Sequence, residues 1–128
     1  MTGFLEGFIW MTFCVYFESG SNKEPDSARE MVAHCVLNRA VKRELTYKEV
    51  VQQPKQFSWF DKRKVPDIKY PLAFINCGKA VWKAWLNHQL GYNYGGVSHF
   101  HDNSIMPYWA PSMKRLGAVG SFQYYKEG

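Results

Sequence analysis

Three long segments of the sequence carry apolar residues at the spacing of an α-helix, and this pattern constrains the fold more than any other feature. The first segment begins at the N-terminus and runs into Tyr16-Phe17-Glu18. The second helix is predicted from about Pro25 to Lys42, and the third from Leu72 to Leu90, where Gly91 follows as a stop signal. The residues expected to face inward are Phe4, Phe8, Met11 and Val15, then Ala28, Met31, Val32, Cys35, Val36 and Arg39, then Ala73, Cys77, Ala80, Val81 and Ala84.

Weaker signals separate and follow these helices. Thr46-Tyr47-Lys48-Glu49 has the form of a capping box and predicts a short helix that ends near Gln53-Pro54. Residues 55–71 have no periodicity and are expected to form a loop. Val97 to His101 alternates like a strand, and residues 121–126 can form a second one.

Residues 106–120, between the two expected strands, are predicted to be partly helical. With 128 residues, the chain matches one compact domain that can bury a core without disulfides or metals. The predicted fold is α+β and mainly helical, one domain over residues 1–128 with a small β element.

Composition narrows the possible partners. Apolar residues make up 46% of the chain, which excludes a disordered protein, and the net charge of +5 favours anionic polymers such as nucleic acid, anionic lipid or bacterial cell wall. The aromatic share of 17% suits either a core or a groove that stacks on sugar rings or bases. Cys14, Cys35 and Cys77 show no ligand or redox spacing, so they are interpreted as buried thiols of a protein made in a reducing compartment, with a pairing between two of them left open.

The apolar N-terminal segment lacks the marks of a signal peptide. It has no basic start and no small-residue cleavage site, and Glu6 interrupts it. The expectation is therefore a protein made in the cytoplasm, without stable insertion into a membrane.

Glu18 is the strongest candidate for acid/base chemistry. It follows Tyr16 and Phe17 at the end of an apolar helix and precedes a loop that contains Gly20, which places a carboxyl group against aromatic rings. Such surroundings disfavour the charged carboxylate, raise its pKa and make it a proton donor near neutral pH. A structural glutamate at a helix end is the alternative interpretation from the residues alone.

His99 and His101 lie two apart on a predicted strand and therefore point the same way, a spacing that some metal sites share. Asp102, His88 or His34 could supply a third ligand. A structural or substrate-contacting role is the favoured reading of these histidines. The run Gln56-Phe57-Ser58-Trp59 offers an amide, a hydroxyl and aromatic faces together, which suits sugar recognition.

Several segments together resemble the SleB-like cell-wall hydrolase family, the catalytic domain of spore-cortex-lytic enzymes and of many phage endolysins. They are Val15-Tyr16-Phe17-Glu18-Ser19, Val32-Ala33-His34-Cys35-Val36-Leu37-Asn38-Arg39, Gln56-Phe57-Ser58-Trp59, Gly96-Val97-Ser98-His99-Phe100-His101 and Pro107-Tyr108-Trp109-Ala110, with Gly120, Phe122 and Tyr124-Tyr125 at the end. The resemblance covers nearly the whole chain and implies a fold like that of goose-type lysozymes and lytic transglycosylases.

The resemblance also implies roles for individual residues. Glu18 takes the place of the family's catalytic acid/base, and Asn38 and Arg39 belong to the helix packed behind the site. The residues expected to bind substrate are Tyr16, Gln56, Phe57, Ser58, Trp59, His99 and His101, and no metal or cofactor is implied. The chain departs from the family pattern at residues 19–23, which lengthen the loop after Glu18, and no catalytic role is expected for Glu24.

The predicted function is cleavage of the peptidoglycan glycan strand between N-acetylmuramic acid and N-acetylglucosamine. A lytic transglycosylase is favoured over a hydrolase because the available second carboxylates, Asp61, Asp67 and Asp102, stand in no recognisable motif. The alternatives are a metal-dependent amidase or peptidase that uses His99 and His101, and a non-catalytic module that binds cell wall or nucleic acid. The favoured protein is a monomeric phage endolysin that does not bind nucleic acid and leaves the cell through holin lesions.

Overall fold

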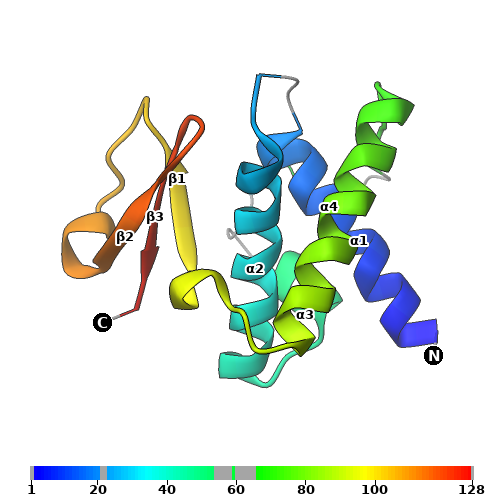
Figure 1. Cartoon of the computed structure of the whole chain (residues 1–128), viewed down its shortest axis with the longest axis horizontal. Coiled ribbons are helices and arrows are strands. Elements are labelled where there is room, and N and C mark those ends of the chain that lie inside the picture. The colour runs from blue at the N-terminus through cyan, green and yellow to red at the C-terminus, as the bar shows by residue number, and fades with distance from the viewer. Residues whose placement is uncertain (1, 21–22, 54–58, 60–65, 128) are drawn as a thin grey trace.

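The computed structural model describes residues 2–20, 23–53, 59 and 66–127, and its helices pack together beside a small sheet (Figure 1). The α-helices of this part of the chain are α1 (Thr2–Ser19), α2 (Asp26–Arg43), α3 (Tyr47–Val51) and α4 (Pro71–Gln89). Figure 1 shows α2 between the sheet on one side and helices α1 and α4 on the other. Helix α2 therefore connects the two parts of the molecule.

The predicted helices are confirmed, with boundaries close to those expected. Pro25 precedes α2 as its N-cap residue instead of lying in its first turn, and Glu44 ends α2 in the left-handed conformation with φ of 55°. The capping box is present, because the Thr46 side chain accepts a hydrogen bond from the Glu49 backbone and the Glu49 side chain accepts one from the Thr46 backbone. The last element, α4, starts at Pro71, where a missing N–H costs nothing.

The sheet has three antiparallel strands in the order β1-β3-β2. They are β1 (His99–Asp102), β2 (Lys114–Val119) and β3 (Phe122–Lys126), and β1 pairs with β3 so that His99 lies opposite Tyr125. Short 3-10 helices occupy Tyr94–Gly96 and Ala110–Ser112.

The prediction of partial helix for residues 106–120 is wrong for most of that range. Only Ala110–Ser112 is helical, as one 3-10 turn, and residues 114–119 form strand β2. A register shift between Arg115 and Gly117 interrupts the pairing of β2 with β3. This irregularity breaks the alternation of apolar and polar side chains by which a strand is recognised in a sequence.

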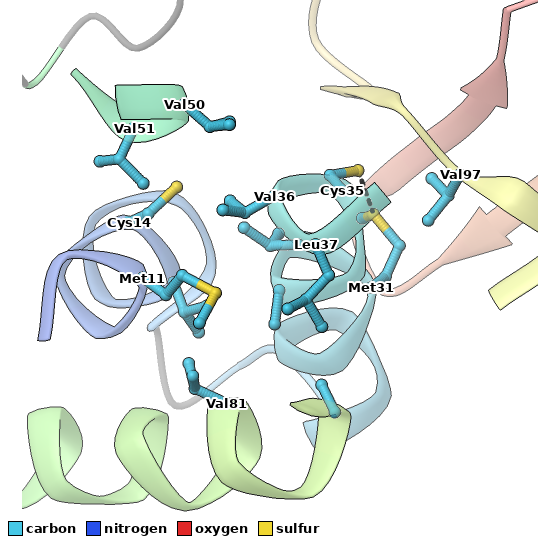
Figure 2. Packing of buried hydrophobic residues seen from close by; sticks show 14 of the residues in the cluster. Met11, Cys14, Met31, Cys35, Val36, Leu37, Val50, Val51, Val81 and Val97 are labelled. Atoms are coloured by element: carbon cyan, nitrogen blue, oxygen red, sulfur yellow. Dashed lines mark hydrogen bonds between the residues drawn. The ribbon is translucent and has the colours of Figure 1, made fainter. Parts of the chain in front are cut away.

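The core lies where α1, α2, α3 and α4 meet (Figure 2). Met11 and Val15 from α1 and Val81 from α4 are fully buried against α2, and Val97 joins the same core from the segment that leads into β1. Each such side chain contributes roughly 1.5–3 kcal/mol when it leaves water. The core therefore fixes both the end of α1 and the start of β1, which carry the candidate site.

The three cysteines are buried and free, so the pairing left open by the sequence is absent. Cys35 lies 3.9 Å from the sulfur of Met31, its neighbour one turn earlier on α2 (Figure 2). In the part of the chain that the structure describes, no helix combines the length and the apolar character needed to cross a membrane.

Candidate active site

Glu18 lies in the last turn of α1, at the wall of a cleft of about 1020 Å³ between the helices and the sheet. The cleft draws residues from the end of α1, from α2, from β1, from the segment after β1 and from β3. Its lining consists of Phe17, Glu18, Arg39, His99, Phe100, His101, Asp102, Ser104, Ile105, Pro107, Tyr108, Trp109, Met113 and Phe122. Carboxyl, guanidinium, imidazole and indole groups thus share one cavity large enough for a sugar chain.

The surroundings of Glu18 raise the pKa of its carboxyl group to about 7. Burial is the main cause, because a carboxylate loses its hydration there. The Trp59 side chain, by hydrogen bonding, and the Arg39 guanidinium, by its charge, favour the carboxylate and lower the pKa in part. Close to neutral pH the group is therefore present in both its acid and its base form, as an acid/base catalyst requires.

Arg39 and Asn38 near the end of α2 donate hydrogen bonds to the backbone of the segment that leads into β1. The Arg39 Nε donates to the backbone oxygen of Ser98 at 2.6 Å, and the Asn38 amide donates to the backbone oxygens of Asn93 at 2.9 Å and Val97 at 2.8 Å. Asn38 thus packs behind the site, as expected. Arg39 also lines the cleft itself, a position that the sequence did not predict.

Two buried thiols, Cys14 and Cys35, interact electrostatically with both Glu18 and Arg39. Burial raises the pKa of Cys14 well above its usual range and that of Cys35 to about 12, and the charge of Glu18 acts in the same direction on both. These groups stay protonated and uncharged at neutral pH. Neither thiol therefore adds a negative charge near Glu18.

His99 lines the cleft and is uncharged at neutral pH. Burial, followed by the charge of Arg39, lowers the pKa of the imidazole to about 4. Its Nδ1 lies 2.9 Å from the hydroxyl oxygen of Ser98, and its ring contacts the indole of Trp109 with 5.2 Å between centroids.

His101 lines the same cleft but has both ring nitrogens occupied. Nδ1 lies 2.8 Å from the backbone oxygen of Asp102, to which it donates, and Nε2 lies 2.8 Å from the Tyr125 hydroxyl, from which it accepts. The ring also stacks on Tyr125 with 5.3 Å between centroids. A metal ligand needs a nitrogen with a lone pair to spare, which His101 lacks in this arrangement.

The other residues considered as a third metal ligand do not form such a set with His99. His34 is fully buried on α2 and contacts the rings of His88, Tyr92 and Tyr94. Neither His34 nor His88 lines the cleft with Glu18, whereas Asp102 does. Among the described residues, no three side chains of the ligating types are grouped to hold a metal ion.

The remaining predicted substrate-binding residues divide into three cases. Trp59 stacks on Phe17 with 4.9 Å between ring centroids, beside the cleft wall. Tyr16 lines a neighbouring hollow of about 750 Å³ with Lys69 and Tyr70 instead, and its hydroxyl accepts a hydrogen bond from the Tyr70 backbone. Gln56, Phe57 and Ser58 lie outside the described residues.

Sequence reasoning missed much of the cleft opposite Glu18. Trp109 contacts the rings of both His99 and His101, and Tyr108 beside it is 96% exposed at the cleft edge. The motif Pro107-Tyr108-Trp109-Ala110 belongs to the family pattern, but nothing in its spacing indicates which side chains of the folded protein it contacts. Only the fold brings this segment to the cleft.

Glu24 lies outside the cleft lining and has a structural partner. Its carboxylate accepts hydrogen bonds from the backbone N–H and the hydroxyl of Ser121, in the turn between β2 and β3. Gly120 in that turn has φ of 55°, and a Cβ atom there would collide with the Glu24 carboxylate. The contact connects Glu24, just before α2, to the turn between β2 and β3. That Glu24 has no catalytic role stays a prediction.

Comparisons with known proteins agree with this architecture. A model of the cell wall hydrolase family matches residues 23–125. The catalytic domain of the Bacillus cereus SleB protein matches with a TM-score of 0.71 and 20% identity, over 95% of this chain and 91% of that one. The catalytic domain of a germination-specific lytic transglycosylase, SleB from Bacillus anthracis, matches with a TM-score of 0.68 and 20% identity, over 94% and 93% of the two chains. No curated protein matches the chain.

At 20% identity the two solved structures establish the fold. The mainly helical α+β prediction with a small β element is therefore confirmed. The range matched by the family model begins after Glu18, so a role for Glu18 depends on its own sequence motif and geometry.

Proposed function

Because this chain belongs to the cell wall hydrolase family, we propose that it cuts the glycan strand of peptidoglycan with Glu18 as its acid/base. The bond cleaved is the one between N-acetylmuramic acid and N-acetylglucosamine. The observation that carries this proposal is the pKa of about 7 of a carboxyl group at the wall of a large cleft with polar and aromatic lining. A glycosidic oxygen leaves only when it is protonated, and Glu18 is the group in the cleft placed to hold that proton near neutral pH.

In the first step the protonated Glu18 gives its proton to the glycosidic oxygen as the bond from that oxygen to the anomeric carbon breaks. The freed sugar leaves with a hydroxyl group, and the anomeric carbon becomes electron-poor. The Glu18 carboxylate then takes the proton of the nucleophile that attacks this carbon. Glu18 ends the cycle protonated, as it began.

For the second step we propose that the nucleophile is the 6-hydroxyl group of the same muramic acid residue. Its oxygen bonds to the anomeric carbon, its proton passes to Glu18, and a 1,6-anhydro sugar forms without consuming water. One matching structure is described as a lytic transglycosylase, which supports this route. Hydrolysis would instead require a water molecule and, in most glycosidases, a second carboxylate.

Of the three second carboxylates considered above, the two that the structure describes give hydrolysis little support. Asp67 lines the neighbouring hollow and not the cleft with Glu18, and Asp61 lies outside the described residues. Asp102 does line the cleft, where it accepts hydrogen bonds from the backbone N–H of Ser104 at 2.6 Å and from the Ser104 hydroxyl. These bonds lower the pKa of Asp102 and hold it to its own turn.

The proposal is tested by digestion of purified peptidoglycan with and without a chelator, with the soluble products identified by mass spectrometry. The wild type is expected to release anhydro-muropeptides, Glu18→Gln to release none, and Asp102→Asn to keep the activity. Glu6→Gln is the matched control, because Glu6 lies exposed on the same helix and forms an ion pair with Lys48.

The other products would point elsewhere. Reducing-end muropeptides that disappear in Asp102→Asn would establish hydrolysis with Asp102 as the second carboxylate. Free peptide stems, or activity that the chelator removes, would replace the proposal with a metal-dependent amidase. Binding to cell walls without any soluble product would leave only the binding module.

The predictions of a monomer without nucleic-acid binding, and of a phage endolysin released through holin lesions, remain proposals from the sequence. Expression in the cytoplasm of a susceptible host together with an inducible holin tests the last of these. Lysis is expected only when both proteins are made, and lysis without the holin would contradict this mode of release.

A further inference from the structure

The two ring nitrogens of His99 have different surroundings. Nδ1 lies 2.9 Å from the hydroxyl oxygen of Ser98, and that oxygen accepts a hydrogen bond from the backbone N–H of Glu127 at 3.2 Å. Ser98 is buried, with 5% of its surface exposed. Its hydroxyl hydrogen has no acceptor in the described chain other than His99 Nδ1, so a proton on Nδ1 would leave that hydrogen buried and unpaired.

The hydrogen-bond chain from Glu127 through Ser98 therefore assigns the ring proton of neutral His99 to Nε2. The pKa of about 4 means that the ring carries this one proton throughout the neutral range. Nε2 makes no hydrogen bond to any residue the structure describes, and the side chain lines the cleft that holds Glu18. The cleft thus contains an N–H donor of fixed position that no residue in the described part of the chain accepts from.

His101, two residues along the same strand, shows the contrast. Its Nδ1 is engaged by the Asp102 backbone and its Nε2 by the Tyr125 hydroxyl, both at 2.8 Å. The donor capacity of His101 is used inside the protein. Of the two histidines, His99 is the one with a hydrogen bond to give to a ligand.

We propose that His99 donates its Nε2–H to the carbonyl oxygen of an acetamido group on the bound glycan, while the Trp109 indole packs against the methyl group. This proposal rests on the function proposed above for the cleft. An uncharged donor pairs with an uncharged amide oxygen without burying a charge, whereas a lactyl or peptide carboxylate at the same place would lose its hydration and gain no opposite charge from His99. The Trp109 ring lies 5.2 Å from the His99 ring, so the cleft places an apolar face beside the donor, which an acetamido group matches and a sugar hydroxyl does not.

A binding experiment tests this independently of turnover. Peptide-free glycan strands are titrated by calorimetry into Glu18→Gln protein that carries His99, His99→Leu or His99→Gln. Three strand preparations are compared: native, enzymatically N-deacetylated, and deacetylated then chemically reacetylated. Leucine removes the donor at similar size, whereas the glutamine amide places an N–H at a reach similar to that of imidazole Nε2.

We expect His99→Leu to weaken binding of native and reacetylated strands by on the order of tenfold, as the loss of one hydrogen bond predicts. His99→Gln should recover most of that loss. On deacetylated strands the three proteins should bind equally, because the acceptor is gone. Thermal unfolding of each variant checks that the fold is intact.

Two outcomes would overturn the proposal: equal binding of native strands by all three proteins, or the same loss in His99→Leu on native and deacetylated strands. An absence of strand binding by any of them would overturn it as well. Failure of the proposed function shows separately, since wild-type enzyme would then release no anhydro-muropeptides in a Glu18-dependent manner. Product analysis of the wild type and strand binding by the variants thus report on different claims.

Discussion

Glu18→Gln should make the folded protein more stable at alkaline pH while it removes catalysis. In the wild type the carboxyl group of Glu18 has a pKa of about 7, against 4.5 for an unperturbed glutamate side chain, chiefly because burial disfavours its charged form. Folding therefore costs free energy wherever the unfolded chain carries a carboxylate. Glutamine has the shape of the protonated acid and never charges, so it avoids that cost.

The magnitude follows from proton linkage between the folded and unfolded states. A folded-state pKa above the unfolded value leaves stability unaffected at low pH and lowers it as the pH rises from about 4.5 to about 7, with no further change above. For these two pKa values the penalty is about 1 kcal/mol at pH 5 and about 3 kcal/mol at pH 8, since each pKa unit corresponds to about 1.4 kcal/mol. The advantage of Glu18→Gln over the wild type should therefore grow by roughly 2.5 kcal/mol across this range.

Urea unfolding of both proteins at pH 5, 6, 7 and 8 measures this difference, and all other titrating groups cancel in the comparison. Glu6→Gln on the same helix is the control. It loses only the exposed ion pair with Lys48, so its difference from the wild type should stay within about 1 kcal/mol and should not rise with pH. A Glu18→Gln advantage that is constant from pH 5 to pH 8 would refute the assignment of a raised pKa and, with it, the proton-donor role.

Three further predictions concern Arg39, the core residue Leu37 and the α3 cap Thr46. Arg39→Met should move the alkaline limb of the pH–activity profile to higher pH, because the Arg39 charge lowers the pKa of Glu18. Arg39→Lys keeps the charge and should leave the limb closer to its wild-type position. Initial rates from pH 5 to pH 9 measure the shift. Leu37→Ala should lower the free energy of unfolding by about 3 kcal/mol, since Leu37 is 1% exposed in the core, as urea titration can show. Thr46→Ala removes the cap of α3 and should cost about 1 kcal/mol in the same assay, and Thr46→Ser should restore it.

The helical part of the fold was predictable because its physical signals are local. Apolar residues three and four apart mark α1, α2 and α4, and the Thr46–Glu49 capping box marks the start of α3 within one residue. Strand β2 gave no such signal. It has exposed residues at 114 and 115 and a register shift before Gly117, and it exists because β3 offers it a partner.

The candidate site, like the fold, was predictable only where local sequence signals determine it. The prediction of a raised pKa for Glu18 needed only its place after Tyr16 and Phe17 at a helix end, and the structure agrees. The opposite wall of the cleft was not predictable, because Trp109 reaches the cleft through a loop whose path depends on the sheet. The different hydrogen bonding of His99 and His101 likewise depends on Ser98, Glu127 and Tyr125, which only strand pairing brings together.

Arg39 acts on both sides of the cleft, on Glu18 and on the segment that carries His99. Burial alone would push the pKa of Glu18 above its value of about 7, and the acid would then give up its proton too reluctantly at neutral pH. The Trp59 hydrogen bond and, to a lesser extent, the Arg39 charge lower that pKa. The same guanidinium holds the backbone oxygen of Ser98 at 2.6 Å, and Ser98 in turn orients His99. One buried side chain, Arg39, therefore contributes both to the acidity of Glu18 on one side of the cleft and to the position of the His99 donor on the other. Changes at Arg39 should for this reason affect both the pH profile and the affinity for glycan, whereas changes at His99 should affect only the affinity.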